Sequence, residues 1–302
     1  MADSGIQLTV VIADREAEGS LGSALGAIRD ACRGLDVELL VVGDHASSDP
    51  EWPLPAGRDV HRLALPRGTL TPVLWGAGAR VARGRVVAFT TSQMRVAEGW
   101  GRALHDAIGH DTIGSAGAIG LAGDAGGATA ALYFVRFSAF LPESVPVGGR
   151  AMRDIPGDNA AYLGSAIQRE EDLLADGFWE VEFHRRFARD GQVLRLIPGA
   201  EATMGGPIDF TTSVRQRFAH ATEFGASRVA RHGESVSRVV LAAPLVPLLL
   251  VLRIGRRVLP HARYRAAFAT SLPWLLALAT AWAAGEALGA LRSRQRAPGR
   301  AR

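Results

Sequence analysis

Apolar residues form short unbroken runs in the first third of the chain, and amphipathic stretches separate these runs. Leu8 to Ala13 and Val37 to Val42 are each apolar except at their second position, and Val86 to Phe89 is apolar without alternation, which is typical of parallel strands buried on both faces. Helical spacing runs from Ser20 to Ala31 and from Leu70 to Arg83. Alternating strands and helices predict an α/β fold built on a doubly wound, mostly parallel, Rossmann-like sheet.

Further elements follow at shorter and less regular intervals. We expect additional strands at 60–65, 113–121, 128–137 and 193–197. We expect additional helices at 100–108, 168–174, 178–190 and 210–231, and a loop at 145–153. Gly191 is expected to follow the end of the third of these helices, where a left-handed backbone favours glycine.

Polar residues follow three of the predicted strands at the point where each strand ends. Asp14 follows the first, Asp44 the second, and Thr90 to Gln93 the strand that reaches Phe89. Right-handed crossovers bring these carboxyl ends to one edge of the sheet, where open α/β sheets bind ligands. No Asp or Glu lies between Gly84 and Ala97, so a metal-binding carboxylate pair is absent from this stretch.

Charge and cysteine content narrow the possible partners. The chain has 34 basic residues, all arginine, and 30 acidic ones. From Arg253 to Arg302 the only acid is Glu286, so this basic region suits an anionic membrane. Nucleic acid is a weaker alternative, because no aromatic residues interleave the arginines as a stacking platform. The single cysteine, Cys32, excludes an internal disulfide and a cysteine zinc cluster, and it reads as a small core residue.

Two apolar stretches near the end of the chain suggest contact with a membrane. Val239 to Leu252 has 14 residues, fewer than the roughly 20 needed to span a bilayer, and Phe268 to Leu291 is marginal. Any crossing would place Arg253 to Arg265 or Arg292 to Arg302 outside, against the positive-inside rule. A monotopic arrangement keeps every arginine on the cytoplasmic side. Spanning helices and buried helices of a soluble protein are the alternatives. No signal peptide is evident, so the body is expected in the cytoplasm.

The order of these motifs resembles family-2 glycosyltransferases, an inverting family with the GT-A fold. LTVVIADRE, a helix and then ELLVVGDHASSD resemble the family's opening, in which a second strand ends in VVDDGSxD. Asp44 matches the second Asp of that motif, which in the family contacts the base or ribose of the sugar donor. Gly43 replaces the first Asp. The resemblance implies that Asp14 and Asp44 bind the nucleotide.

VVAFTTSQMRVAEGW resembles the family's central segment V-A-F-x-D-x-D, with Trp100 matching its trailing Trp. Thr91 and Gln93 stand where most members have two metal-binding Asp residues, and neutral side chains are poor ligands for Mg²⁺ or Mn²⁺. A divalent metal is therefore doubtful, and the resemblance implies that Thr91, Ser92 and Gln93 line the donor diphosphate. Either arginine neutralises the diphosphate in place of metal, or donor binding has been lost. The candidate arginines are Arg95, Arg215 and Arg217.

DGFWEVEFHRRFARDG resembles the family helix E-D-x-x-L-x-x-R-L-x-x-x-G. Counting back from Gly191 places Arg186 on the family Arg and Glu180 on the Asp that serves as catalytic base. Trp179 replaces the preceding acid. One carboxylate suffices to take the acceptor's proton in an inverting transfer. The alternative is that Glu180 and Glu182 are solvated first-turn residues stabilised by the helix dipole.

Two later segments complete the resemblance. GDNAAY precedes the acceptor region in the family, so Asn159 would line the acceptor pocket, or else occupy a turn after Pro156. The basic stretch Phe210 to Arg231 would cover the diphosphate or lie at the membrane interface. The expected division is a catalytic domain at 1–209, a basic segment at 210–238 and membrane-associated helices with an arginine-rich tail at 239–302.

Together these features imply a glycosyltransferase at the cytoplasmic face of the membrane. It would move a sugar from a nucleotide-sugar donor to a lipid-linked or cell-envelope acceptor, with inversion and with Glu180 as base. A catalytically inactive, glycosyltransferase-like membrane scaffold or binding protein is the alternative, because the central acids are missing.

Overall fold

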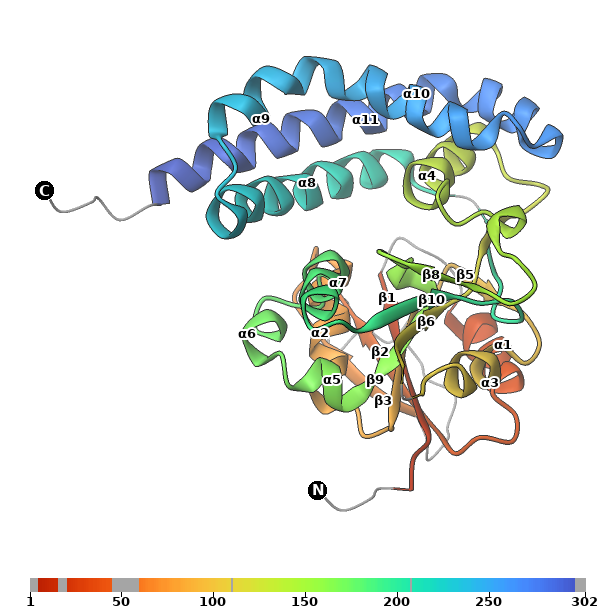
Figure 1. The fold of residues 1–302 in the computed structure, drawn as a ribbon. Coiled ribbons are helices and arrows are strands. Elements are labelled where there is room, and N and C mark those ends of the chain that lie inside the picture. Colours follow the sequence, from red (N-terminus) through yellow and green to blue (C-terminus); the bar gives the residue numbers. More distant parts are fainter. Residues whose placement is uncertain (1–4, 16–20, 45–59, 110, 207, 297–302) are drawn as a thin grey trace, which may run out of the picture. The chain divides into compact units, whose positions relative to one another are not determined.

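Strands and helices alternate along the first half of the protein, as the hydrophobic pattern predicts. The structure is a computed structural model and describes residues 5–15, 21–44, 60–109, 111–206 and 208–296. It contains two compact units, whose elements are labelled in Figure 1. The sheet unit comprises residues 1–122 and 140–206, and the helical unit comprises residues 123–139 and 207–302.

An eight-stranded sheet, in the order β3-β2-β1-β4-β9-β6-β10-β8, organises the sheet unit. β3, β2, β1 and β4 are parallel, β9 lies antiparallel between β4 and β6, β10 is parallel to β6, and β8 is antiparallel to β10. The expected α/β class with a mostly parallel sheet is confirmed. The strands are β1 (Leu8–Asp14), β2 (Val37–Gly43), β3 (Val60–Ala64), β4 (Val86–Thr91), β6 (Thr112–Ala116), β8 (Arg150–Met152), β9 (Ala160–Leu163) and β10 (Val193–Leu196).

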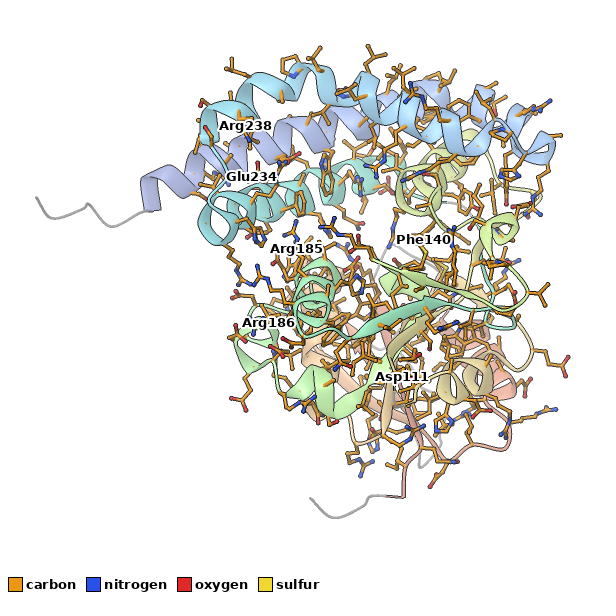
Figure 2. All side chains as sticks on the ribbon, in the orientation of Figure 1. Asp111, Phe140, Arg185, Arg186, Glu234 and Arg238 are labelled. Carbon is orange, nitrogen blue, oxygen red and sulfur yellow. The ribbon has the colours of Figure 1, made fainter. Side chains whose placement is uncertain are left out.

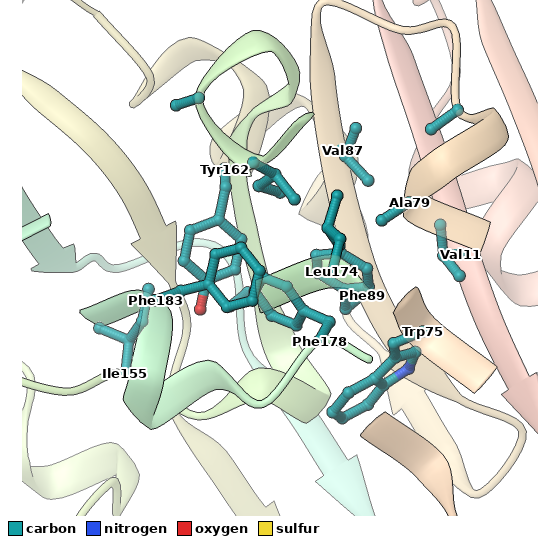
Figure 3. Packing of buried hydrophobic residues seen from close by; sticks show 14 of the residues in the cluster. Val11, Trp75, Ala79, Val87, Phe89, Ile155, Tyr162, Leu174, Phe178 and Phe183 are labelled. Atoms are coloured by element: carbon teal, nitrogen blue, oxygen red, sulfur yellow. The ribbon is translucent and has the colours of Figure 1, made fainter. Parts of the chain in front are cut away.

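Helices cover both faces of this sheet, which explains its unbroken apolar strands. Val11 and Phe89 point to one face and pack with Trp75 and Phe178 (Figure 3). Alternate residues such as Ile12 point to the other face. The helices of the unit are α1 (Leu21–Ala31), α2 (Thr71–Val81), α3 (Trp100–Asp106), α5 (Gly164–Gln168), α6 (Glu171–Leu174) and α7 (Glu180–Arg189), with the 3-10 turns η1 (Pro142–Ser144) and η2 (Gly157–Asn159).

A network of hydrogen bonds closes the amino-terminal edge of the sheet. Glu38 is buried on β2, and its Oε2 accepts from the Thr9 hydroxyl at 2.8 Å and from the Arg83 backbone N–H at 3.1 Å. Its Oε1 accepts from Arg83 Nε at 2.7 Å. Thr9 Oγ1 in turn accepts from the Gly84 N–H at 2.8 Å. Each of these buried side-chain oxygens therefore has a partner.

Several expected elements differ from the structure. The stretch 128–137, expected as a strand, is helix α4 (Gly127–Phe137), because an apolar run of this length can bury itself equally well in helical form. The expected strand 113–121 breaks after Ala116, and its second part, β7 (Ile119–Leu121), joins a separate sheet. That sheet has the order β5-β11-β7, with β5 (Met94–Val96) and β11 (Ala202–Met204).

Other boundaries shift by smaller amounts. The expected helix 168–174 is two short helices, α5 and α6, and part of the expected loop 145–153 is strand β8. α7 begins at Glu180 rather than at 178, and Gly191 follows it with φ 71°, as expected for a left-handed residue. Cys32 is buried, as expected, and burial raises the pKa of its thiol to about 12.

The helical unit is built on two long helices that run parallel. Gly285 of α11 lies against Phe218 of α8, and Gly289 lies against Thr222 one turn further along both helices. Any side chain at these glycines would clash with the backbone of α8. The helices of this unit are α4, α8 (Phe210–His232), α9 (Val236–Ala242), η3 (Ala243–Leu245), α10 (Val246–Val258) and α11 (Ala262–Arg296).

The buried acid of α11, Glu286, is neutralised inside this unit. Its carboxylate pairs with Arg228 of α8 and accepts from Trp282 Nε1 at 3.2 Å. Arg228 also pairs with Glu234 at 3.0 Å. The acid that interrupts this apolar stretch is therefore compensated by a neighbouring helix.

Two helical stretches, Val236–Val258 and Ala262–Ser293, are long and apolar enough to cross a membrane, which is weak support for membrane association. The first has 23 residues, because the helical stretch extends beyond the 14-residue apolar run Val239 to Leu252 at both ends. Pro244 and Pro247 do not interrupt it, since they lie in the first turns of η3 and α10, where a backbone N–H is not needed. Large apolar side chains are exposed along it: Leu241, Leu245, Leu248, Leu249 and Leu252.

Candidate functional site

The carboxyl edge of the main sheet brings together residues from β1, β2 and β4. Asp14 pairs with Gly43 in the register of β1 and β2, and Ala13 pairs with Thr91 in that of β1 and β4. The Asp44 N–H donates to the Asp14 carbonyl at 3.3 Å. Asp14, Asp44 and Thr91 therefore lie at one edge, as the crossover argument predicts.

Asp44 is buried, and its carboxylate is held from two sides. Oδ2 accepts from the Gly68 backbone N–H at 3.1 Å. The same oxygen lies 3.8 Å from Nε of Arg15, the residue that follows β1. Both side chains of this ion pair are 8% exposed. Of the motif that contains Asp44, residues 45–49 lie outside the described residues.

The end of β4 carries a run of buried polar atoms that have no hydrogen-bond partner among the described residues. The hydroxyl oxygens of Thr90, Thr91 and Ser92 and the Oε1 atom of Gln93 are all buried without a hydrogen bond from the described residues. The backbone of this segment is fixed, since the Ser92 N–H donates to the Ala13 carbonyl at 3.1 Å. Unpaired buried polar atoms are rare in native proteins and cost about 1–3 kcal/mol each, so a cluster of them calls for a ligand or water.

Trp75 links this edge to Glu180. The indole Nε1 of Trp75 donates to the Thr90 carbonyl at 2.9 Å. A Cβ at position 157 would lie 3.1 Å from Trp75 Cζ3 and 3.3 Å from Glu180 Cδ. Gly157 therefore leaves room for both side chains, and the side chains of Glu180 and Trp75 both lie close to Gly157.

Glu180 is the first residue of α7, where the helix dipole favours an ionised carboxylate. A buried chain of polar groups lies nearby. The Tyr162 hydroxyl bonds His184 Nε2 at 2.8 Å, and His184 Nδ1 lies 3.3 Å from Asp154 Oδ1. Figure 3 shows Tyr162 among the aromatic side chains of this core. Burial, and then the charges of Glu180 and Asp154, raise the pKa of Tyr162 well above its usual value.

Burial and hydrogen bonding set the protonation states of His184 and Asp154. Burial lowers the pKa of His184, and its hydrogen bond to Asp154 opposes this only in part. The hydrogen bond to His184 lowers the pKa of Asp154. A neutral imidazole that donates from Nδ1 to the carboxylate leaves Nε2 to accept from the Tyr162 hydroxyl.

Asn159 is placed beside the same edge but is engaged in the core. Its Nδ2 donates to the carbonyls of Ala118 and Ala200 at 3.0 and 2.9 Å. Its Oδ1 accepts from Trp100 Nε1 at 2.6 Å. Both amide donors are thereby used within the protein, and an acceptor contact for Asn159 stays a prediction.

The arginines expected at the diphosphate belong to different units of the protein. Arg186 of α7, labelled in Figure 2, bonds Glu170 at 2.6 Å and Asp172 at 2.9 Å. Arg215 and Arg217 belong to α8 of the helical unit, where the guanidinium of Arg217 lies 4.1 Å from the ring centre of Trp282. Their relation to the sheet edge stays a prediction.

The two positions expected to hold a divalent metal carry neutral side chains. Thr91 and Gln93 offer neutral oxygens where carboxylates are needed. Among the described residues, no three His, Cys, Asp or Glu side chains converge in a way that could hold a metal ion.

Sequence reasoning missed four contributors to this region: Arg15, Trp75, Tyr162 and His184. Trp75 and Tyr162 read as ordinary core aromatics, and nothing in the pattern separates Arg15 from an exposed turn residue. Comparison with known proteins adds no assignment, because no family model matches the chain and no curated protein is similar to it.

Proposed function

We propose that this protein is an inverting glycosyltransferase that uses a nucleotide-sugar donor. The observation that carries the proposal is the run of unpaired buried oxygens at Thr90 to Gln93. It lies beside Asp14 and Asp44 at the edge where open α/β sheets bind ligands. The hydroxyl groups of Thr90, Thr91 and Ser92 can donate hydrogen bonds to phosphate oxygens. The order of partial family-2 motifs along the chain points to the same chemistry.

Glu180 is the proposed base. In the transfer, the hydroxyl oxygen of the acceptor attacks the anomeric carbon and forms the new glycosidic bond. The bond from that carbon to the diphosphate breaks, and its electron pair leaves with the nucleoside diphosphate. The acceptor proton passes to the Glu180 carboxylate. Glu180 and Trp75, which bonds the Thr90 carbonyl, both lie close to Gly157, and this position supports the role.

The proposed acceptor is lipid-linked or part of the cell envelope, and the proposed location is the cytoplasmic face of the membrane. The row of exposed leucines on α9 to α10 and the arginines that follow it support a monotopic arrangement. The two long apolar helices leave spanning as the alternative.

A binding protein without turnover is the second candidate, and the neutral residues Thr91 and Gln93 favour it. Titration of UDP and GDP into the detergent-solubilised protein, with Mn²⁺ and with EDTA, is the first test. Binding that survives EDTA supports the proposed site. Absence of binding by every nucleotide diphosphate and sugar nucleotide, in both conditions, overturns the function.

Turnover separates the two candidates once a donor binds. We expect Glu180→Gln to lower the transfer or donor-hydrolysis rate by roughly 10²- to 10⁴-fold while leaving nucleotide affinity unchanged. Glu182→Gln is the matched control, since Glu182 lies in the same first turn and bonds Arg185 at 3.3 Å. Equal rates in wild type and Glu180→Gln would remove Glu180 from the mechanism.

A further inference from the structure

Arg15 is a buried cation at the carboxyl edge of the sheet, and its bonding is incomplete. It is 7% exposed, and its Nε has no hydrogen-bond partner among the described residues. The carboxylate of Asp44 lies 3.8 Å away, beyond hydrogen-bond distance. An arginine buried for structural reasons alone is normally bonded in full, because desolvating a charge is costly.

The Nε atom of Arg15 lies at the same edge as the hydroxyls of Thr90, Thr91 and Ser92, which also have no hydrogen-bond partner among the described residues. Arg15 follows β1 directly, and β1 pairs with β4 in a register that sets Ala13 opposite Thr91. The Ser92 N–H donates to the Ala13 carbonyl, which fixes the two strand ends side by side. One strand end thus supplies a positive charge with several N–H donors, and its neighbour supplies the hydroxyl groups of Thr90, Thr91 and Ser92, which have no partner among the described residues.

We propose that Arg15 binds the diphosphate of the ligand and supplies there the positive charge that a divalent metal would otherwise provide. A planar guanidinium matches phosphate oxygens with two parallel hydrogen bonds, and Ser and Thr hydroxyls complete such a site. Asp44, whose Oδ2 is already bonded by Gly68, holds Arg15 at the edge by charge without using its Nε. This inference rests on the proposed function for the nature of the ligand, but not for the presence of an anion site.

The site has a defined ligand chemistry: a diphosphate group, bound without metal. In the proposed transfer, Arg15 would stabilise the negative charge that develops on the leaving diphosphate. The affinity difference between a nucleoside diphosphate and its nucleoside should therefore depend on Arg15 and should not depend on Mn²⁺.

The experiment is calorimetric titration of the full chain in detergent with UDP, uridine, GDP, guanosine and inorganic pyrophosphate, each in EDTA. In Arg15→Gln we expect the diphosphates to bind roughly 10- to 100-fold more weakly, with nucleoside affinity unchanged. Arg15→Lys keeps the positive charge but not the planar guanidinium that makes two parallel hydrogen bonds, so we expect an intermediate loss of diphosphate affinity. Arg85→Gln, at the opposite end of β4, is the matched control and should bind like wild type.

The outcomes distinguish this inference from the proposed function. Equal losses for nucleoside and diphosphate in both Arg15 variants would assign Arg15 a structural role and overturn the inference alone. Diphosphate binding that requires Mn²⁺ would overturn it as well. Pyrophosphate binding that depends on Arg15, with no binding of any nucleotide, would support the anion site and overturn the proposed function. Thermal melting of each variant confirms that it is folded.

Discussion

At the amino-terminal edge of the main sheet, every side-chain oxygen of Glu38 and Thr9 has a hydrogen-bond partner. At the carboxyl edge, the corresponding atoms of Thr90 to Gln93 have none among the described residues. Both edges belong to one sheet, and β1 contributes to each of them. We infer that the difference in hydrogen bonding reflects different roles of the two edges, one structural and one in ligand binding.

This contrast suggests that the amino-terminal edge of the sheet serves stability and that the carboxyl edge serves ligand binding. Full pairing at one edge anchors β1, β2 and the turn that leads into β4. Incomplete pairing at the other costs stability that only a ligand or ordered water can recover. If the comparison holds, substitutions at the amino-terminal edge change stability alone, and substitutions at the carboxyl edge change binding more than stability.

The largest effect is expected at Glu38. Glu38→Ala removes the acceptor for the Thr9 hydroxyl and for two Arg83 groups, so we expect unfolding free energy to fall by about 2–3 kcal/mol. Chemical denaturation measures this loss. Asp30→Ala is the control, since Asp30 pairs with Arg33 on the surface and contributes little. UDP affinity should stay as in wild type, and a loss as large as that of Arg15→Gln would contradict the separation.

The long buried strands of the sheet could be predicted from sequence because each is a nearly continuous run of apolar residues. β1 and β4 are buried at every position and mostly apolar, and the strand order determines which polar residues share an edge. β5, β9 and β11 have only three or four residues each, too few for a period to show. α4 was mistaken for a strand because its buried Ala, Tyr and Phe residues carry no polar face.

The site was predictable only in part, for a different reason. Asp14, Asp44 and Thr91 follow strands, so topology alone brings them together. The burial of Arg15 depends on packing, which no local pattern records. The bond between Tyr162 and His184 joins residues 22 positions apart on a strand and a helix, and only the folded chain aligns them.

A second prediction concerns His184, a buried side chain near the site that is hydrogen-bonded on both ring nitrogens. Burial lowers the pKa of His184 in the folded state, so the unfolded chain binds its proton more readily. Stability is therefore complete above the unfolded pKa of about 6.5 and is lost as pH falls toward the folded value. We expect wild type to lose more stability between pH 7.5 and 5.0 than His184→Gln, measured by urea midpoints.

Asp154→Asn sharpens this test. Because the hydrogen bond and charge of Asp154 raise the pKa of His184, their removal should lower it further and enlarge the acid loss. The Asp154 carboxyl itself titrates below this window, since its pKa is already lowered. Identical pH dependence in wild type and His184→Gln would mean that the imidazole is not held neutral by burial.

The smallest expected effect is also the most direct comparison of the two edges. Thr91→Val keeps the shape of the side chain and removes a hydroxyl that has no partner among the described residues. We expect unfolding free energy to stay the same or to rise by up to about 1 kcal/mol, and UDP affinity to fall roughly 3- to 10-fold.

Thr9→Val makes the identical change at the other edge, where the hydroxyl bonds Glu38 and Gly84. There we expect stability to fall by about 1–2 kcal/mol with UDP affinity unchanged. Opposite responses to one chemical change would show that the unpaired hydroxyl serves a ligand. Equal losses of stability would mean that Thr91 is bonded within the folded protein, and the proposed site would lose its main support.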